Sequence, residues 1–97
     1  MTVRFSTNDK GGGPAGKLAD AELHFSGGPL DGLKLIGFTV WERRDGGRNV
    51  TLPSRPYSVN GARRSFAFLR PSSEDRRAQD AIRNCILDAY NRLEVPF

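Results

Sequence analysis

Arginine is concentrated in the middle of this sequence, in a pattern suited to binding phosphate. The segment 43–64, RRDGGRNVTLPSRPYSVNGARR, contains one carboxylate, Asp45, and six arginines: Arg43, Arg44, Arg48, Arg55, Arg63 and Arg64. A guanidinium binds a phosphate through two parallel hydrogen bonds and stacks on aromatic rings and bases. Crowded like charges repel one another unless anions lie alongside them. The segment therefore predicts a surface that binds a polyanion, and nucleic acid is the interpretation that we favour.

The net positive charge of the chain comes from the same arginine-rich segment and the residues just after it. The 97 residues carry a formal charge of +4. Acids slightly outnumber bases both before residue 43 and after residue 70, so the positive excess lies wholly in residues 43–70, where Arg70 is a seventh arginine. A concentrated basic block attracts and steers polyanions better than scattered charges do. The alternative is a protein-interaction module whose basic loop docks on an acidic partner protein.

Two aromatic residues accompany these arginines. Trp41 comes just before Arg43, and Tyr57 follows Arg55 by two residues. Because the bases of single-stranded nucleic acids stack on such rings, both are candidate binding residues. Packing in a dimer interface is an equally good interpretation for Trp41. The phenylalanines of the predicted strands follow the apolar alternation, so we expect them in the core: Phe38, Phe66 and Phe68.

Catalytic and metal-binding patterns find little support. GGGPAGKL (11–18) nearly matches the phosphate-binding loop of nucleotide triphosphatases, but Leu18 replaces the required Ser or Thr and a strand, not a helix, should follow. His24 is the only histidine and Cys85 the only cysteine, too few for a zinc site with four N or S ligands. The sequence also has no G-x-S-x-G motif of serine hydrolases and no second histidine, so it offers no pair of a nucleophile and a general base. The sequence predicts neither an enzyme nor a cofactor, metal or small-molecule substrate.

Apolar periodicity predicts the elements that position the arginines. Residues 1–17 are polar and rich in glycine and are interpreted as a flexible tail, which leaves residues 18–97 as a single domain. Period-2 alternation and turn residues predict strands over 19–25, 33–42, 49–53 and 64–70. The second strand then has two faces, one with Ile36, Phe38 and Val40 and the other with Leu35, Gly37, Thr39 and Trp41.

A helix is predicted at the end of the chain. Ser72 or Ser73 can cap it, and Glu74 and Asp75 suit its first turn. Its apolar stripe has spacings of three and four: Ala78, Ile82, Cys85, Ile86, Ala89 and Leu93. The whole pattern predicts an α+β fold, a four-stranded antiparallel meander with one C-terminal helix packed on one face.

The helix can cover only one face of such a sheet. The other face would carry Leu35, Thr39 and Trp41, together with Ala67 and Leu69 from the fourth strand. We expect that face either to bury against a second subunit or to serve as a binding platform. No stretch is apolar enough to span a membrane, a signal-peptide core is missing, and one cysteine fits a reducing compartment. These features predict a cytoplasmic protein.

Two segments resemble the septation protein SpoVG family. IRNCILDAYNRL (82–93) resembles its C-terminal helix, with matches at Ile82, Ile86, Leu87, Tyr90, Arg92 and Leu93. VWERRDGG followed by VTLPSR resembles its strand, turn and V-x-M-P-S-[KR] element, with matches at Val50, Leu52, Pro53, Ser54 and Arg55. The likeness spans residues 33–93. The chain departs from the family in its glycine-rich N-terminus, where the family has a further strand, and in a longer, more aromatic hairpin.

The resemblance implies a small bacterial homodimer that binds DNA or RNA and regulates transcription without catalysis. Of the six arginines, only Arg55 matches a basic position of the family, the one after Pro53 and Ser54. The roles of the other five depend on the charge argument alone.

Overall fold

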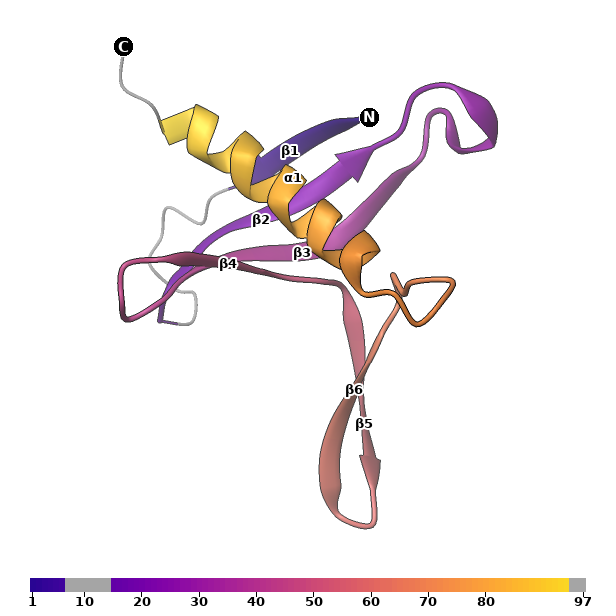
Figure 1. The fold of residues 1–97 in the computed structure, drawn as a ribbon, viewed down its shortest axis with the longest axis vertical. Coiled ribbons are helices and arrows are strands. Elements are labelled where there is room, and N and C mark those ends of the chain that lie inside the picture. Colours follow the sequence, from indigo (N-terminus) through magenta and orange to yellow (C-terminus); the bar gives the residue numbers. More distant parts are fainter. Residues whose placement is uncertain (7–14, 95–97) are drawn as a thin grey trace.

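The computed structural model describes residues 1–6 and 15–94. These two described segments form six strands, one short 3-10 helix and one α-helix. In chain order the elements are β1 (Thr2–Ser6), β2 (Lys17–His24), η1 (Gly28–Leu30), β3 (Lys34–Glu42), β4 (Arg48–Thr51), β5 (Ser54–Val59), β6 (Ala62–Ala67) and α1 (Arg77–Glu94). Figure 1 shows α1 lying across the sheet, with the β5–β6 hairpin pointing away from both.

Strands β1 to β4 form one antiparallel sheet in sequence order. The helix α1 packs on one face of it, in contact with β4 and β1. This confirms the predicted α+β fold, with a four-stranded antiparallel meander and a C-terminal helix. The strands that make up the meander differ from the predicted set at both ends.

The prediction of a flexible tail over residues 1–17 was wrong at both of its ends. Residues 2–6 form β1, which pairs with β2 from Thr2 opposite His24 to Ser6 opposite Asp20. Val3 and Phe5 point to the core side and pack against it. The glycine-rich tract 11–14, with most of the near-match to a phosphate-binding loop, lies outside the described residues. Lys17 and Leu18, the last two residues of the near-match, already belong to β2. A strand therefore follows the glycine-rich tract, as predicted.

The predicted fourth strand, 64–70, does not join the sheet. Its first part belongs to β6, which pairs only with β5 in a separate two-stranded hairpin. We call this hairpin, residues 54–67, the arm. Every residue of β5 and all but the last of β6 are exposed. With the arm projecting from the body, the radius of gyration is 14.9 Å, where a compact chain of this length has about 12.5 Å.

The core lies between the sheet and α1. Its fully buried side chains include Phe38, Val40 and Val50 from the sheet and Ile86 from the helix. Phe38 is fully buried as predicted, but Phe66 and Phe68 are 47% and 58% exposed, so their assignment to the core was wrong. Alternation shows which residues share a face, but it does not show whether another element covers that face.

A bulge in β3 corrects the predicted faces of that strand. Ala21 pairs with Phe38 while Leu23 pairs with Leu35, so β3 has one more residue than β2 between these pairs. Gly37 makes the bulge with a φ of 104°, a conformation that favours glycine. The shift turns Leu35 toward the core and leaves Ile36 60% exposed. The predicted positions of Leu35 and Ile36 were therefore reversed.

The helix starts later than predicted. Its first residue is Arg77, whose amide donates a hydrogen bond to Asp75 Oδ1 at 3.0 Å. Arg76 is the N-cap residue, since its carbonyl accepts from the Gln79 and Asp80 amides. The Asp75 side chain just before it caps the first helical amide, in place of Ser72 or Ser73. Of the predicted stripe, Ile86 is buried and Ile82 packs against the core, whereas Leu93 is 65% exposed. Within residues 1–6 and 15–94, no helix is long and apolar enough to cross a membrane.

Candidate nucleic-acid interface

The β3–β4 turn displays Arg43 and Arg44. The Arg43 amide donates to the Gly47 carbonyl at 2.7 Å, and the Gly46 amide donates to the Arg43 carbonyl at 3.0 Å. Asp45 Oδ1 accepts a hydrogen bond of 2.8 Å from the Gly47 amide. The only carboxylate of the arginine-rich segment is therefore used to close the turn, while both arginine side chains are exposed.

Arg48 has a different environment from the other five arginines. It opens β4 and is only partly exposed. Its Nη1 donates to Asn91 Oδ1 at 2.6 Å, and its guanidinium lies 5.0 Å from the centre of the Tyr90 ring. Tyr90 in turn meets Phe5 edge-on, with ring centres 5.4 Å apart. Arg48 thus joins β4 to α1, a structural contact that the sequence pattern did not indicate.

The arm divides its three arginines between its two faces. Antiparallel partners share a face, and the register pairs Ser58 with Arg63 and Tyr57 with Arg64. The first face holds Arg63 among small side chains: Ser54, Pro56, Ser58, Ser65 and Ala67. The second face holds Arg55 and Arg64 among larger ones: Tyr57, Val59, Ala62 and Phe66. The two sets of arginines therefore point in opposite directions.

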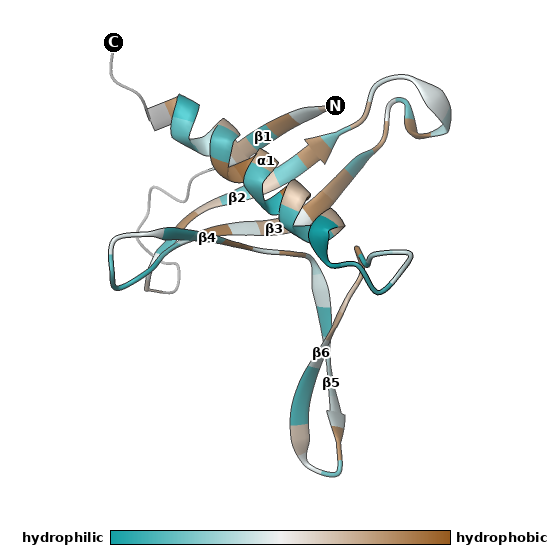
Figure 2. Cartoon of the chain, viewed as in Figure 1, coloured by the Kyte–Doolittle hydropathy of each residue, from teal (hydrophilic) through white to brown (hydrophobic). Residues whose placement is uncertain are grey.

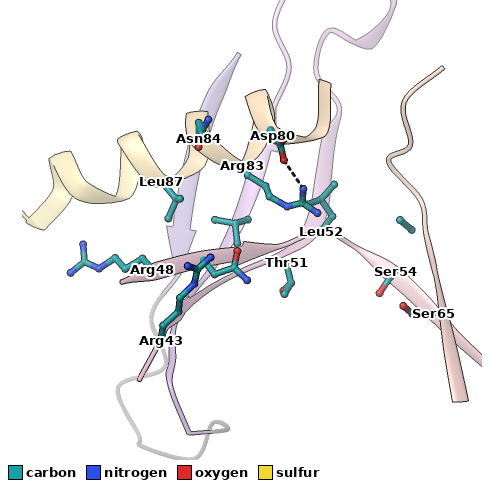
Figure 3. A pocket seen from close by; sticks show the side chains of 13 residues that line it. Arg43, Arg48, Thr51, Leu52, Ser54, Ser65, Asp80, Arg83, Asn84 and Leu87 are labelled. Atoms are coloured by element: carbon teal, nitrogen blue, oxygen red, sulfur yellow. Dashed lines mark hydrogen bonds and ion pairs between the residues drawn. The ribbon is translucent and has the colours of Figure 1, made fainter. Parts of the chain in front are cut away.

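The first face of the arm borders a groove of about 680 Å³ between β4, α1 and the root of the arm. Figure 3 shows Arg43 and Arg48 at one side of it, Ser54 and Ser65 at the other, and Arg83 with Asp80 on the helix. We call it the basic groove; its lining residues are Arg43, Arg48, Asn49, Val50, Thr51, Leu52, Ser54, Ser65, Ala67, Asp80, Arg83, Asn84 and Leu87. It brings together Arg43 and Arg48, two of the predicted binding residues.

A second hollow, of about 770 Å³, adjoins the basic groove. The two share Ala67, Asp80 and Arg83, and the second adds Arg70 and Arg76. Arg83 Nη1 lies 3.2 Å from Asp80 Oδ1. The sequence interpretation did not include Arg83 among the binding residues. The sequence could have indicated it, because Arg83 comes three residues before Ile86 on the predicted helix. The two side chains therefore lie on neighbouring parts of the helix surface, near the sheet.

Ion pairs do not neutralise the exposed arginines. Ion pairs among the described side chains include Lys17–Asp20, His24–Glu22, Lys34–Glu22, Arg77–Asp75 and Arg83–Asp80. None of them involves Arg43, Arg44, Arg55, Arg63 or Arg64. In the described part of the chain, five of the six predicted arginines thus lie at the surface without an ion-pair partner.

Trp41 and Tyr57 lie on different elements. Trp41 is half-buried on β3, on the face away from the helix, and its Nε1 donates to Thr51 Oγ1 at 2.9 Å. Tyr57 is 43% exposed on the second face of the arm. The structure therefore does not bring the two predicted stacking residues into one pair.

The only histidine belongs to a charged cluster on the uncovered face of the sheet. Glu22 Oε1 lies 3.0 Å from His24 Nε2, and Glu22 Oε2 lies 3.5 Å from Lys34 Nζ. The hydrogen bond with His24, aided by the charge of Lys34, lowers the pKa of the Glu22 carboxyl below its usual value. In the described part of the chain, no group of three or more His, Cys, Asp or Glu side chains is arranged to hold a metal ion.

No protein-family model, no curated protein and no solved structure matches this chain. The resemblance to the septation protein SpoVG family stays a prediction drawn from residues 33–93.

Proposed function

We propose that this protein binds DNA or RNA through the arm and the basic groove, and that it regulates gene expression without catalysing a reaction. One observation carries the proposal. Residues 54–70 contain four arginines and no carboxylate, and this segment includes an arm whose residues are almost all exposed. Such a surface attracts a polyanion from a distance and then binds its phosphates through paired hydrogen bonds.

The arrangement of the charges supports a ligand longer than one phosphate. The basic groove is lined by the exposed Arg43, by Arg48 on its contact with Tyr90 and by Arg83 beside Asp80, and the arm extends from its edge. Contacts of this kind fix the position of a nucleic acid backbone but do not read its sequence. We therefore expect strong dependence on salt and weak discrimination between sequences.

The resemblance to the SpoVG family supports the same function. The strand β1 adds to it, since the family has a further N-terminal strand where the sequence suggested only a tail. A homodimer in the bacterial cytoplasm is part of this proposal.

An acidic protein partner is the second candidate. It is favoured by the apolar residues beside the arginines, because protein interfaces combine arginine with aromatic side chains. On the arm these include Tyr57, Val59 and Phe66, each more than 40% exposed.

Binding measured at several salt concentrations tests the proposal. We would titrate the protein into short labelled single-stranded DNA, duplex DNA and single-stranded RNA, and follow fluorescence anisotropy from about 50 to about 200 mM salt. The logarithm of the affinity should fall linearly with the logarithm of the salt concentration, because each phosphate that is neutralised releases counterions.

Two results would count against the proposal. Failure to bind any of the three nucleic acids at the lowest salt concentration would favour the acidic protein partner. Affinity that does not change with salt would exclude a surface that acts through phosphate contacts. A mass measurement in solution on the same preparation tests the homodimer.

A further inference from the structure

The second face of the arm alternates arginines with aromatic rings. Tyr57 is paired with Arg64, and the next pair on the same face is Arg55 with Phe66. Each ring therefore has an arginine directly across the hairpin, and Tyr57 and Phe66 occupy diagonal positions, whose Cα atoms are roughly 7–8 Å apart in an antiparallel pair. Figure 2 shows hydrophilic and hydrophobic stretches along both strands of the arm. Tyr57 and Phe66 are 43% and 47% exposed, so both rings can be reached from solvent.

Phe66 is also held in place from one side. The Arg70 guanidinium lies 4.8 Å from the centre of the Phe66 ring, and Phe68 meets Phe66 at an angle of 70° with ring centres 6.4 Å apart. These contacts restrict the Phe66 ring before any ligand arrives, which lowers the entropy that binding must remove. They also set a third arginine beside the aromatic surface.

We propose that this face binds single-stranded nucleic acid, with bases stacked on Tyr57 and Phe66 and phosphates held by Arg55 and Arg64. The inference rests on the proposed function and specifies its substrate class. Rings stack on bases only where the base faces are accessible, and in a duplex neighbouring base pairs cover those faces. Exposed rings between the arginines would add stacking contacts to a single strand but not to a duplex, which such a surface binds through its phosphates.

A second copy of the chain is the other occupant to consider. Exposed apolar residues on a hairpin are typical of surfaces buried between subunits. Packing two arms face to face would, however, bring Arg55 and Arg64 of both copies together. Residues 54–70 offer no carboxylate to compensate them. Like charges brought together in an interface oppose association, whereas a phosphate backbone supplies the missing anions.

Four variants test the inference: Tyr57→Ala, Phe66→Ala, Tyr57→Phe and the control Ile36→Ala. Each alanine variant on the arm should weaken binding of single-stranded DNA or RNA by about fivefold or more, since a stacked base contributes about 1–3 kcal/mol. Binding of a duplex should change by less than twofold. Tyr57→Phe keeps the ring and should bind as the wild type does. Ile36→Ala removes a side chain of comparable exposure, 60%, from the sheet and should leave binding unchanged.

Fluorescence gives a readout specific to stacking. Trp41 is the only tryptophan, so the W41F/Y57W double variant has its single indole on the arm. Single-stranded oligonucleotides should quench this indole when they bind, and the duplex should not. Circular dichroism confirms that each variant is folded.

Three outcomes overturn the inference in distinguishable ways. Salt-dependent binding that is equally tight for single strands and duplexes, or unchanged in both alanine variants, refutes the stacking and leaves the proposed function standing. A dimer that dissociates in the Tyr57→Ala and Phe66→Ala variants shows instead that a second copy covers this face. Lack of binding to every nucleic acid refutes the proposed function together with the inference.

Discussion

The guanidinium of Arg48 lies 5.0 Å from the centre of the Tyr90 ring, and its Nη1 donates to Asn91 Oδ1. This arginine therefore connects the edge strand β4 to the C-terminal helix. Its neighbours in the sequence, Arg43 and Arg44, project into solvent from the turn before β4. One run of similar residues thus contains side chains that hold the fold together and side chains that are available to a ligand.

Arg48→Ala should lower the free energy of unfolding by about 1–2 kcal/mol, because both the stacking on Tyr90 and the bond to Asn91 are lost. Arg44→Ala, in the exposed turn, should change it by less than about 0.5 kcal/mol. Urea denaturation followed by circular dichroism measures both. Equal stability of the two variants would contradict a structural role for Arg48.

Arg55→Ala combined with Arg64→Ala should reduce the salt dependence of binding to single strands. Each lost phosphate contact lowers the slope of log affinity against log salt by about 0.7, so the pair should lower it by about 1.4. The double variant Arg4→Ala with Arg92→Ala removes the same charge from exposed sites outside the arm. If the control flattens the slope as much, net charge and not the arm determines binding.

Phe38→Ala and Phe66→Ala should differ sharply in stability. Phe38 is fully buried in the core and Phe66 is 47% exposed on the arm. The first change should cost about 3–5 kcal/mol through lost burial and the cavity left behind. The second should cost less than about 1 kcal/mol. Thermal or chemical unfolding gives the comparison, and a large loss for Phe66→Ala would mean that the arm is covered in solution.

Gly37→Ala should be among the most destabilising single-methyl changes in the protein. Gly37 has a φ of +104°, and a Cβ built there would lie 2.8 Å from the Cβ of Pro53. Gly61→Ala is the matched control, since Gly61 also has a positive φ, +80°, but nothing within 4 Å of the added atom. Both variants place an alanine at a positive φ, so a lower melting temperature for Gly37→Ala than for Gly61→Ala measures the clash with Pro53. Equal melting temperatures would contradict it.

The cap of α1 predicts an acid dependence. The Arg77 guanidinium, helped by the Arg77 amide, lowers the pKa of the Asp75 carboxyl below its usual value. A carboxyl whose pKa is depressed by folding stabilises the native state above its unfolded pKa, roughly 3.9, and the contribution disappears as the pH falls through the folded pKa. Asp75→Asn should therefore flatten the fall in melting temperature below about pH 4.

Glu74→Gln is the control for this measurement. It removes the same charge beside the cap but leaves in place the hydrogen bonds that Arg77 donates to Asp75. If the melting temperature falls equally at low pH in Asp75→Asn and in the wild type, the cap is excluded as the cause of that fall.

The sequence predicted the meander and the helix because Phe38, Val40 and Ile86 follow clear periodic patterns, and burial enforces those patterns. It missed β1 because Val3 and Phe5 alternate over only five residues, beside a long glycine-rich tract. Ile36 was assigned to the wrong face because the bulge at Gly37 shifts the alternation of β3. The bulge depends on tertiary packing against Pro53, which the local sequence does not show.

The candidate site was predicted less well than the fold. The charge pattern found the arginines but could not show that Arg48 stacks on Tyr90, forty-two positions further along the chain. It also missed Phe66, since alternation alone made this ring a core residue. The contacts that distinguish exposed side chains from packed ones join distant parts of the chain, and local patterns do not contain them.

The arm joins the body of the protein at Pro53 and Phe68, where the Phe68 amide donates to the Pro53 carbonyl at 3.0 Å. Since the core consists of residues outside the arm, substitutions on the arm cost the fold little. Changes to the surface of the arm should thus leave the thermal stability of the body almost unchanged. The body should therefore tolerate a hairpin with a different pattern of rings and charges between Pro53 and Phe68, and in that sense it is a scaffold for a variable surface.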